Sequence, residues 1–74
     1  MTLYQLLKEN ETMIYQFVKV GILSYTIIRD IGIYENYLQL DKINKESKYL
    51  LLAEDFEIGY KRIQQIILNM EKRI

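Results

Sequence analysis

Helix breakers are nearly absent from this chain of 74 residues, which contains no proline and only three glycines. Residue types that helices accommodate well, such as Leu, Lys, Glu and Gln, are abundant instead. Helix boundaries must therefore come from Gly, Asn, Asp and Ser, which favour caps and turns. An all-α fold is expected.

The length of the chain limits it to one domain, residues 1–74, because a chain this short buries only about 60% of its unfolded surface and has no room for a second core. Its composition, 50% hydrophobic and 27% charged, is typical of a globular protein. The N-terminus lacks the basic and apolar regions of a signal peptide, and no window approaches 18 uninterrupted apolar residues. A cytoplasmic location is expected.

Two residue types that carry much of enzyme chemistry are missing, since the chain has no Cys and no His. Disulfides, thiolate metal sites and cysteine nucleophiles are excluded, and the commonest general base is lost. Glu54, Asp55 and Glu57 form an acidic cluster, but a chain this small offers no enclosed pocket for them, so we interpret them as a solvated face. We expect no enzyme activity, no cofactor and no metal site.

Apolar periodicity and capping residues predict four helices, at residues 2–20, 24–40, 45–57 and 60–73. Residues 10–12 are a possible interruption of the first, Gly21 a left-handed cap at its end, and Ser24 the N-cap of the second. The apolar positions of the first helix are Leu3, Leu7, Ile14, Phe17 and Val18; those of the second are Ile27, Ile28, Ile31, Tyr34 and Leu38. The last helix has the clearest stripe, formed by Ile63, Ile66, Ile67, Met70 and Ile74.

Seven tyrosines are many for a chain of 74 residues, and three of them, Tyr25, Tyr34 and Tyr37, belong to the second predicted helix. We expect their rings in the core and their hydroxyls at the surface.

The segment LLLAEDFEIGYKRIQQII has a spacing that suits two helices crossing at a tight turn. Ala53 is small enough for a close approach of the two backbones, and Phe56 and Ile58 bracket the turn. Ile63 and Ile66 would face back onto the first helix. This segment resembles the helix-turn-helix unit of bacterial transcriptional regulators, in which a small residue stands ten positions before an aliphatic one, as Ala53 does before Ile63. Glu57 departs from that pattern, which usually has Gly in the turn because φ is positive there.

The resemblance implies a compact four-helix bundle with a C-terminal helix-turn-helix, whose last helix enters the major groove of double-stranded DNA. At 100° per residue, Lys61, Gln64, Gln65, Leu68 and Lys72 share the face opposite the apolar stripe. Gln, Lys and an exposed Leu suit contacts with base edges, while Arg62, Arg73, Lys45 and Lys48 would hold phosphates. The predicted DNA-binding residues are Tyr60, Lys61, Arg62, Gln64, Gln65, Leu68, Lys72, Lys45 and Lys48.

A homodimer is expected, because one small module seldom buries enough surface for specific DNA binding. The formal net charge of zero argues for a second hypothesis. The alternative is a small helical protein-interaction module, an adaptor or antitoxin-like partner that buries an apolar helix face against another chain. A basic stripe along the last helix would favour DNA, and a contiguous apolar patch would favour a protein partner.

Overall fold

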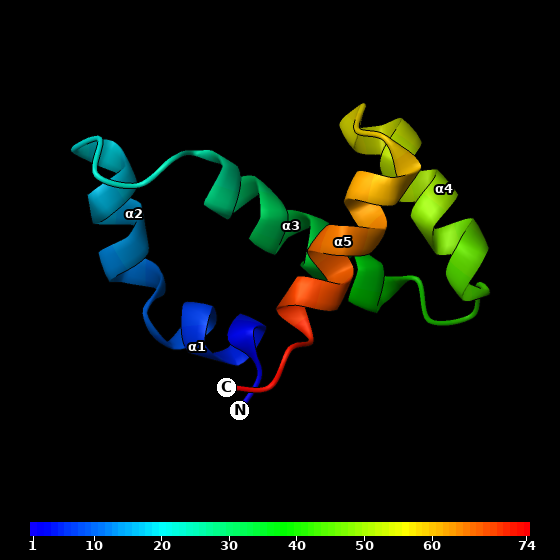
Figure 1. Ribbon diagram of the computed structural model, residues 1–74, viewed down its shortest axis with the longest axis horizontal. Coiled ribbons are helices and arrows are strands. Elements are labelled where there is room, and N and C mark those ends of the chain that lie inside the picture. The colour runs from blue at the N-terminus through cyan, green and yellow to red at the C-terminus, as the bar shows by residue number, and fades with distance from the viewer.

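Five α-helices account for the regular structure in the computed structural model, which describes residues 1–74 (Figure 1). The all-α prediction is confirmed, but the chain has one helix more than expected. The helices are α1 (Leu3–Glu9), α2 (Glu11–Lys19), α3 (Thr26–Gln39), α4 (Lys45–Phe56) and α5 (Tyr60–Met70).

The additional helix arises because the first predicted helix breaks at Asn10. The backbone of Asn10 leaves the helical region, with φ −110° and ψ 21°, and its side-chain amide donates to the Leu6 carbonyl at 2.9 Å. Asn and Asp side chains compete for backbone groups in this way and so favour helix ends. At the other end of α1, Thr2 and Gln5 form a reciprocal capping box with hydrogen bonds of 2.8 and 3.2 Å.

Gly21 takes the left-handed conformation at the end of α2 as predicted, but the N-cap of α3 is Tyr25 and not the predicted Ser24. Gly21 has φ 87°, and it closes α2 with hydrogen bonds from Gly21 N–H to the Val18 carbonyl (3.1 Å) and from Ile22 N–H to the Phe17 carbonyl (2.9 Å). This pair of bonds is the Schellman motif. The Ser24 hydroxyl accepts from the Thr26 amide at 3.2 Å, and the Asn44 side chain accepts from the Ser47 amide at 2.8 Å.

The core lies between α3, α4 and α5, which pack against one another. Leu38 was predicted to lie on the apolar face of α3, but it is 49% exposed in the last turn of this helix and does not belong to the core. Tyr37, which stacks on Tyr49 of α4, is buried in that part of the helix instead. The core side chains are Ile31, Ile33, Tyr34, Tyr37, Tyr49, Leu52, Ile63, Ile66, Ile67 and Met70.

A row of five tyrosine rings crosses this core and joins four helices. Successive ring centroids in the order Tyr4, Tyr34, Tyr37, Tyr49, Tyr60 are 4.8, 5.9, 6.0 and 5.6 Å apart. Such offset or tilted ring pairs stabilise beyond the area that they bury. Tyr34 and Tyr37 have buried rings as predicted, whereas Tyr25 is 70% exposed and the prediction for it is wrong.

The C-terminal residues leave α5 earlier than predicted, because they pair with the N-terminus. The Leu3 amide donates to the Lys72 carbonyl at 2.8 Å and the Ile74 amide to the Met1 carbonyl at 2.9 Å. The helix therefore ends at Met70, and Ile74, expected on its apolar stripe, is exposed.

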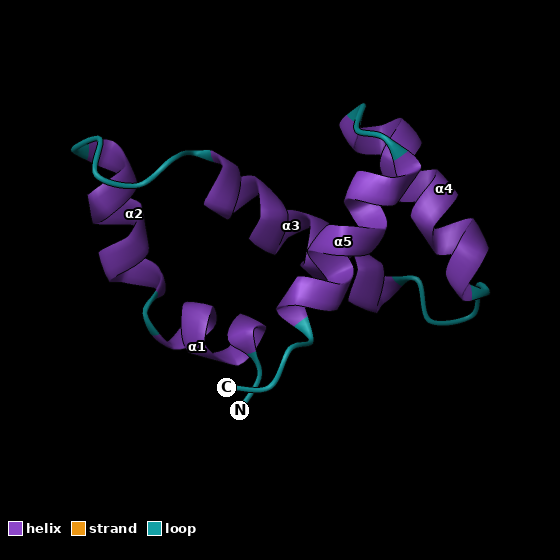
Figure 2. Ribbon diagram, viewed as in Figure 1, coloured by secondary structure: helices purple, strands orange, loops and turns teal.

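α1 and α2 form an arm that leads away from the core (Figures 1 and 2). α1 rests on the core through Tyr4 and Leu7, but α2 buries only Ile14, which is not part of the core cluster. α2 and α4 lie at opposite sides of the molecule in Figure 1. None of the five helices combines the length and the apolarity that crossing a lipid bilayer requires.

Candidate nucleic-acid interface

The turn between α4 and α5 consists of three residues, Glu57, Ile58 and Gly59. Glu57 has φ 55° and ψ 43°, the left-handed conformation, and it is the only residue other than glycine with positive φ. Its amide bonds to the Glu54 carbonyl at 3.4 Å, and the Ile58 amide bonds to the Ala53 carbonyl at 3.1 Å. The backbone therefore forms a second Schellman motif, with glutamate in the position that favours glycine.

The side chains that were expected to hold the two helices together lie on the inner side of this turn. Ala53, Phe56 and Ile58 are half-buried and pack against the core. Ile63 and Ile66 are buried on the facing side of α5. The small Ala53 side chain leaves room where the chain passes back over the end of α4.

α5 divides into a buried and an exposed half, as its sequence predicts. Ile63, Ile66, Ile67 and Met70 are at most 4% exposed. The opposite face is exposed and carries Lys61, Arg62, Gln64, Gln65, Leu68 and Asn69. Asn69 was not among the predicted site residues, although it follows Gln65 by four positions and accepts a hydrogen bond from that side chain at 3.4 Å.

Positive charge on α5 has no counter-ion within the chain. The helix contains no Asp or Glu, and Lys61 and Arg62 take part in none of the ion pairs, which join Lys8 to Glu11 and Glu35, and Arg29 to Asp30. Both cations stand in the first turn, where the helix dipole favours anions, and Gly59 provides no side-chain cap. The start of α5 thus presents unbonded amides and two cations together.

The other predicted site residues lie elsewhere or have other contacts. Lys72 lies beyond the end of α5, in the pairing with the N-terminus, so it does not share the α5 face as predicted. The ring of Tyr60 packs edge-on against Tyr49 at 5.6 Å. Lys45 and Lys48 begin α4, at the end remote from the turn into α5 (Figure 1), and the Lys48 ammonium lies 4.7 Å from the centre of the Tyr37 ring.

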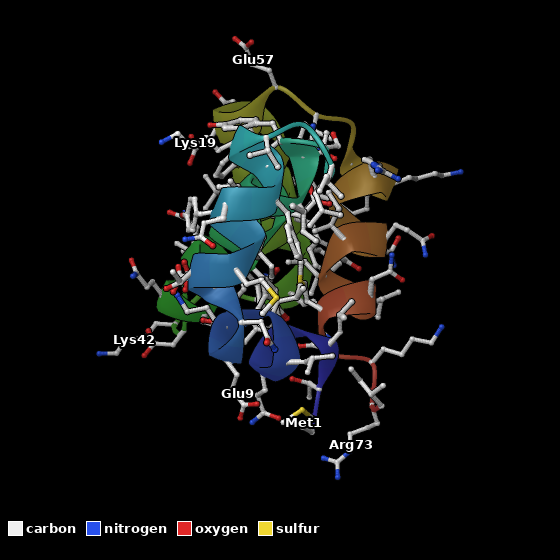
Figure 3. All side chains as sticks on the ribbon, turned by 90° about the vertical axis from the view of Figure 1, so that its left-hand side faces the viewer. Met1, Glu9, Lys19, Lys42, Glu57 and Arg73 are labelled. Atoms are coloured by element: carbon white, nitrogen blue, oxygen red, sulfur yellow. The ribbon has the colours of Figure 1, made fainter.

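The acidic residues near the turn are all exposed. Glu57 stands at one end of the molecule, with Arg73 and Met1 at the other (Figure 3). Glu54, Asp55 and Glu57 do not belong to any group of three or more side chains placed to share a metal ion.

A second cluster of charged groups connects the arm to α3, away from α5. The Tyr4 hydroxyl donates to Glu35 at 2.8 Å, and the Lys8 ammonium lies 3.1 Å from Glu35 and 3.0 Å from Glu11. The hydrogen bond from the Tyr4 hydroxyl, together with the charge of Lys8, lowers the pKa of Glu35. Hydrogen bonds to the carboxylates of Glu11 and Glu35 raise the pKa of Lys8. Because these groups satisfy one another, they hold α1, α2 and α3 together.

No protein-family model, curated protein or solved structure matches this chain. The exposed face of α5 is the surface with the most distinctive chemistry. The amide groups of Gln64 and Gln65 can donate and accept hydrogen bonds together, Lys61 and Arg62 can neutralise phosphates, and Leu68, 51% exposed, can make apolar contact. Side chains of these types serve for contacts with DNA.

Proposed function

We propose that this chain binds double-stranded DNA through α5, as the recognition helix of a helix-turn-helix unit formed by α4 and α5, and that it acts in transcriptional control in bacteria. The observation that carries the proposal is the α5 surface, an exposed polar and basic face without a single carboxylate on a chain of zero net charge. A protein without net charge must present cations without neighbouring carboxylates to bind phosphates, and α5 carries Lys61 and Arg62 with no Asp or Glu in the helix.

The start of α5 supports the proposal in a second way. Two cations in the first turn are unfavourable for an isolated helix, by a few tenths of a kcal/mol to about 1 kcal/mol. A phosphate bound there would reverse this effect, because it would accept from the open amides and neutralise Lys61 and Arg62. Phosphate contacts at this point would fix the orientation of the helix in the groove.

The turn supports the helix-turn-helix assignment. The left-handed conformation of Glu57 occurs at the position where the pattern usually has Gly, so the departure in sequence is not accompanied by a departure in backbone conformation. In the proposed complex, Gln64, Gln65 and Leu68 contact base edges and Lys61 and Arg62 contact phosphates. The contact surface that we propose does not include Tyr60, whose ring packs on Tyr49, or Lys45, Lys48 and Lys72, which lie outside α5.

A salt series tests the proposal. Binding of the purified protein to labelled random-sequence duplex DNA is measured by fluorescence anisotropy over increasing salt. We expect affinity to fall steeply with salt, and the slope of log K against log salt to become shallower by about 2 in the double variant Lys61→Gln, Arg62→Gln, because about one counter-ion is released per phosphate contact.

The matched control is the double variant Lys19→Gln, Lys42→Gln, which removes the same charge from exposed positions outside α5 (Figure 3). It should keep the slope of the unchanged protein. Equal effects of the two double variants would show that binding depends on total charge and not on α5.

The second candidate function is a helical protein-interaction module. The observation that favours it is the pair of large apolar side chains left exposed on α4, Leu50 and Leu51. Absence of DNA binding even at low salt would contradict the first proposal and favour this one.

A further inference from the structure

An apolar stripe along α2 has no partner within the chain. Met13 and Phe17 stand at i and i+4 on one side of α2, and Val20, the residue that caps the C-terminal end of the helix, continues this line at i+7. They are 50%, 37% and 69% exposed, and Ile22, just beyond the helix, is also 69% exposed. α2 forms one side of the molecule, and in Figure 3 no other helix lies in front of it.

The molecule as a whole has more surface than a compact monomer of its mass. Its accessible area is 5311 Å² at 9.0 kDa, whereas folded monomers of that mass expose about 4,850 Å². Its radius of gyration is 12.7 Å, against about 11.3 Å for a compact domain of this length. Both the accessible area and the radius of gyration are larger than for a compact monomer, as expected for an arm that projects from the core.

We propose that a second copy of this chain covers the α2 stripe, so that α2 is the interface of a homodimer. In an interface of two-fold symmetry, a surface packs against the identical surface of the second copy. A net charge on that surface would therefore be repelled by the same charge on the other copy. Met13, Phe17 and Val20 are uncharged, as are the exposed Thr12 and Gln16 beside them, and the one carboxylate that borders the stripe is Glu9, at its Met13 end. The stripe itself thus sets no charge against its own copy.

The positions of the stripe residues also suit antiparallel pairing. Met13 and Val20 are equidistant from a point between Gln16 and Phe17, so a two-fold axis there places Met13 of each copy opposite Val20 of the other. A shallow depression lies beside Met13 at the bend between α1 and α2, where a side chain of the second copy could enter. It is lined by Glu9, Asn10, Thr12, Met13 and Gln16.

The area involved is close to what an interface needs. The excess over a compact monomer is roughly 450 Å² per chain, so two chains that lost it would bury about 900 Å² in total. This total is just below the area of about 1,000 Å² at which specific interfaces begin. α2 and α5 lie apart in Figure 1, so a dimer formed through α2 leaves the α5 face free. The proposed dimer surface on α2 is separate from the proposed DNA-binding face on α5, and it does not depend on DNA binding.

Sedimentation equilibrium without DNA provides the first test. We expect a mass of twice 9.0 kDa for the unchanged protein, and the mass of one chain for the double variant Met13→Glu, Val20→Glu. Far-UV circular dichroism checks that the variant keeps its helices. Tyr15→Glu is the matched control, because it places a charge on another exposed side of α2, and it should remain dimeric. A monomeric unchanged protein, or a dimer that the double variant does not dissociate, would overturn the proposal.

Disulfide trapping provides the second test, and it does not require a variant that dissociates. Because the chain has no cysteine, Gln16→Cys introduces a single thiol next to the proposed axis, and oxidation should join two copies rapidly. Tyr15→Cys places the thiol on another side of α2 and should cross-link much more slowly. Equal rates for the two variants would contradict the proposed pairing. These outcomes are independent of DNA binding, so a failure of this inference and a failure of the proposed function can be told apart.

Discussion

Glu57 and Gly21 occupy the same position in two equivalent helix-ending turns, and only one of them is a glycine. Both have positive φ, 55° and 87° respectively, and both turns carry the same pair of backbone hydrogen bonds. A side chain in the left-handed region costs about 1 to 2 kcal/mol, because Cβ approaches a carbonyl oxygen. The turn before α5 thus contains strain that the turn after α2 avoids.

Substitution of Glu57 by glycine should raise the free energy of unfolding by about 1 kcal/mol, since part of the relieved strain is offset by the greater backbone entropy of glycine in the unfolded chain. Gly21→Ala should lower the free energy of unfolding by a similar amount. Urea unfolding curves measure both. Asp55→Gly, at an exposed position within α4, is the control and should lower it by a few tenths of a kcal/mol, because Gly is a slightly poorer helix former than Asp. A destabilising Glu57→Gly would show that the turn is not under strain.

The buried tyrosines predict a loss of stability at high pH. Burial is the main cause that raises the pKa values of Tyr4, Tyr34, Tyr37 and Tyr49 above 10.0. The folded state therefore holds these protons more tightly than the unfolded state. Its stability is complete below the unfolded pKa of about 10 and is lost as pH rises through the raised folded values.

Urea unfolding at about pH 8 and about pH 11 checks this expectation. Tyr37→Phe should reduce the loss between the two, because one buried hydroxyl no longer titrates. Tyr25→Phe, at a ring that is 70% exposed, is the control. An unfolding free energy that stays constant across this range would contradict the assigned burial of the rings.

At the scale of elements, α4 has a buried and an exposed leucine two positions apart. Leu52 is 1% exposed in the core, and Leu50 is 59% exposed. Leu52→Ala should lower the free energy of unfolding by about 2 to 5 kcal/mol, through lost burial and a remaining cavity. Leu50→Ala should change it by less than about 0.5 kcal/mol. Thermal and urea unfolding compare the two, and losses of equal size would mean that α4 is packed in a different rotation.

Within α5, the proposed roles of Gln65 and Lys61 can be separated on a selected binding sequence. Gln65→Ala should lower the preference for that sequence over others, by about 1 to 3 kcal/mol if the side chain contacts a base. Lys61→Gln should weaken binding to all sequences alike. It should also make the slope of log K against log salt shallower by about 1. Competition assays with base-substituted duplexes measure the difference. Identical behaviour of the two variants would contradict separate roles.

The elements that the sequence predicts best are those in which local pattern and tertiary packing agree. The apolar stripe of α5 through Met70 is buried as expected, and the predicted Gly21 turn is closed by hydrogen bonds between groups a few residues apart along the chain. The end of α5 could not be predicted, because Lys72 bonds to Leu3, which is remote in sequence. The exposure of Leu38 likewise depends on where other helices reach, and periodicity within α3 does not contain that information.

At the scale of the whole molecule, the chain consists of a core of three helices and an arm. Periodicity along residues 2–20 predicted one amphipathic helix, yet Ile14 is its only buried residue and Phe17 remains 37% exposed. A pattern of apolar residues indicates that a face needs a partner, but it does not indicate whether the partner is the same chain. The zero net charge was likewise uninformative, because it does not show that α5 carries Lys61 and Arg62 and no carboxylate.

The most direct test of the proposed function is to observe which residues respond to DNA. A titration of isotope-labelled protein with duplex DNA, followed through backbone amide resonances, assigns the response residue by residue in a chain of 9.0 kDa. We expect the largest shifts at Lys61, Arg62, Gln64, Gln65 and Leu68, and little change along α2. Shifts centred on α2 or on the start of α4, or no shifts at low salt, would contradict the claim that α5 is the DNA-binding helix.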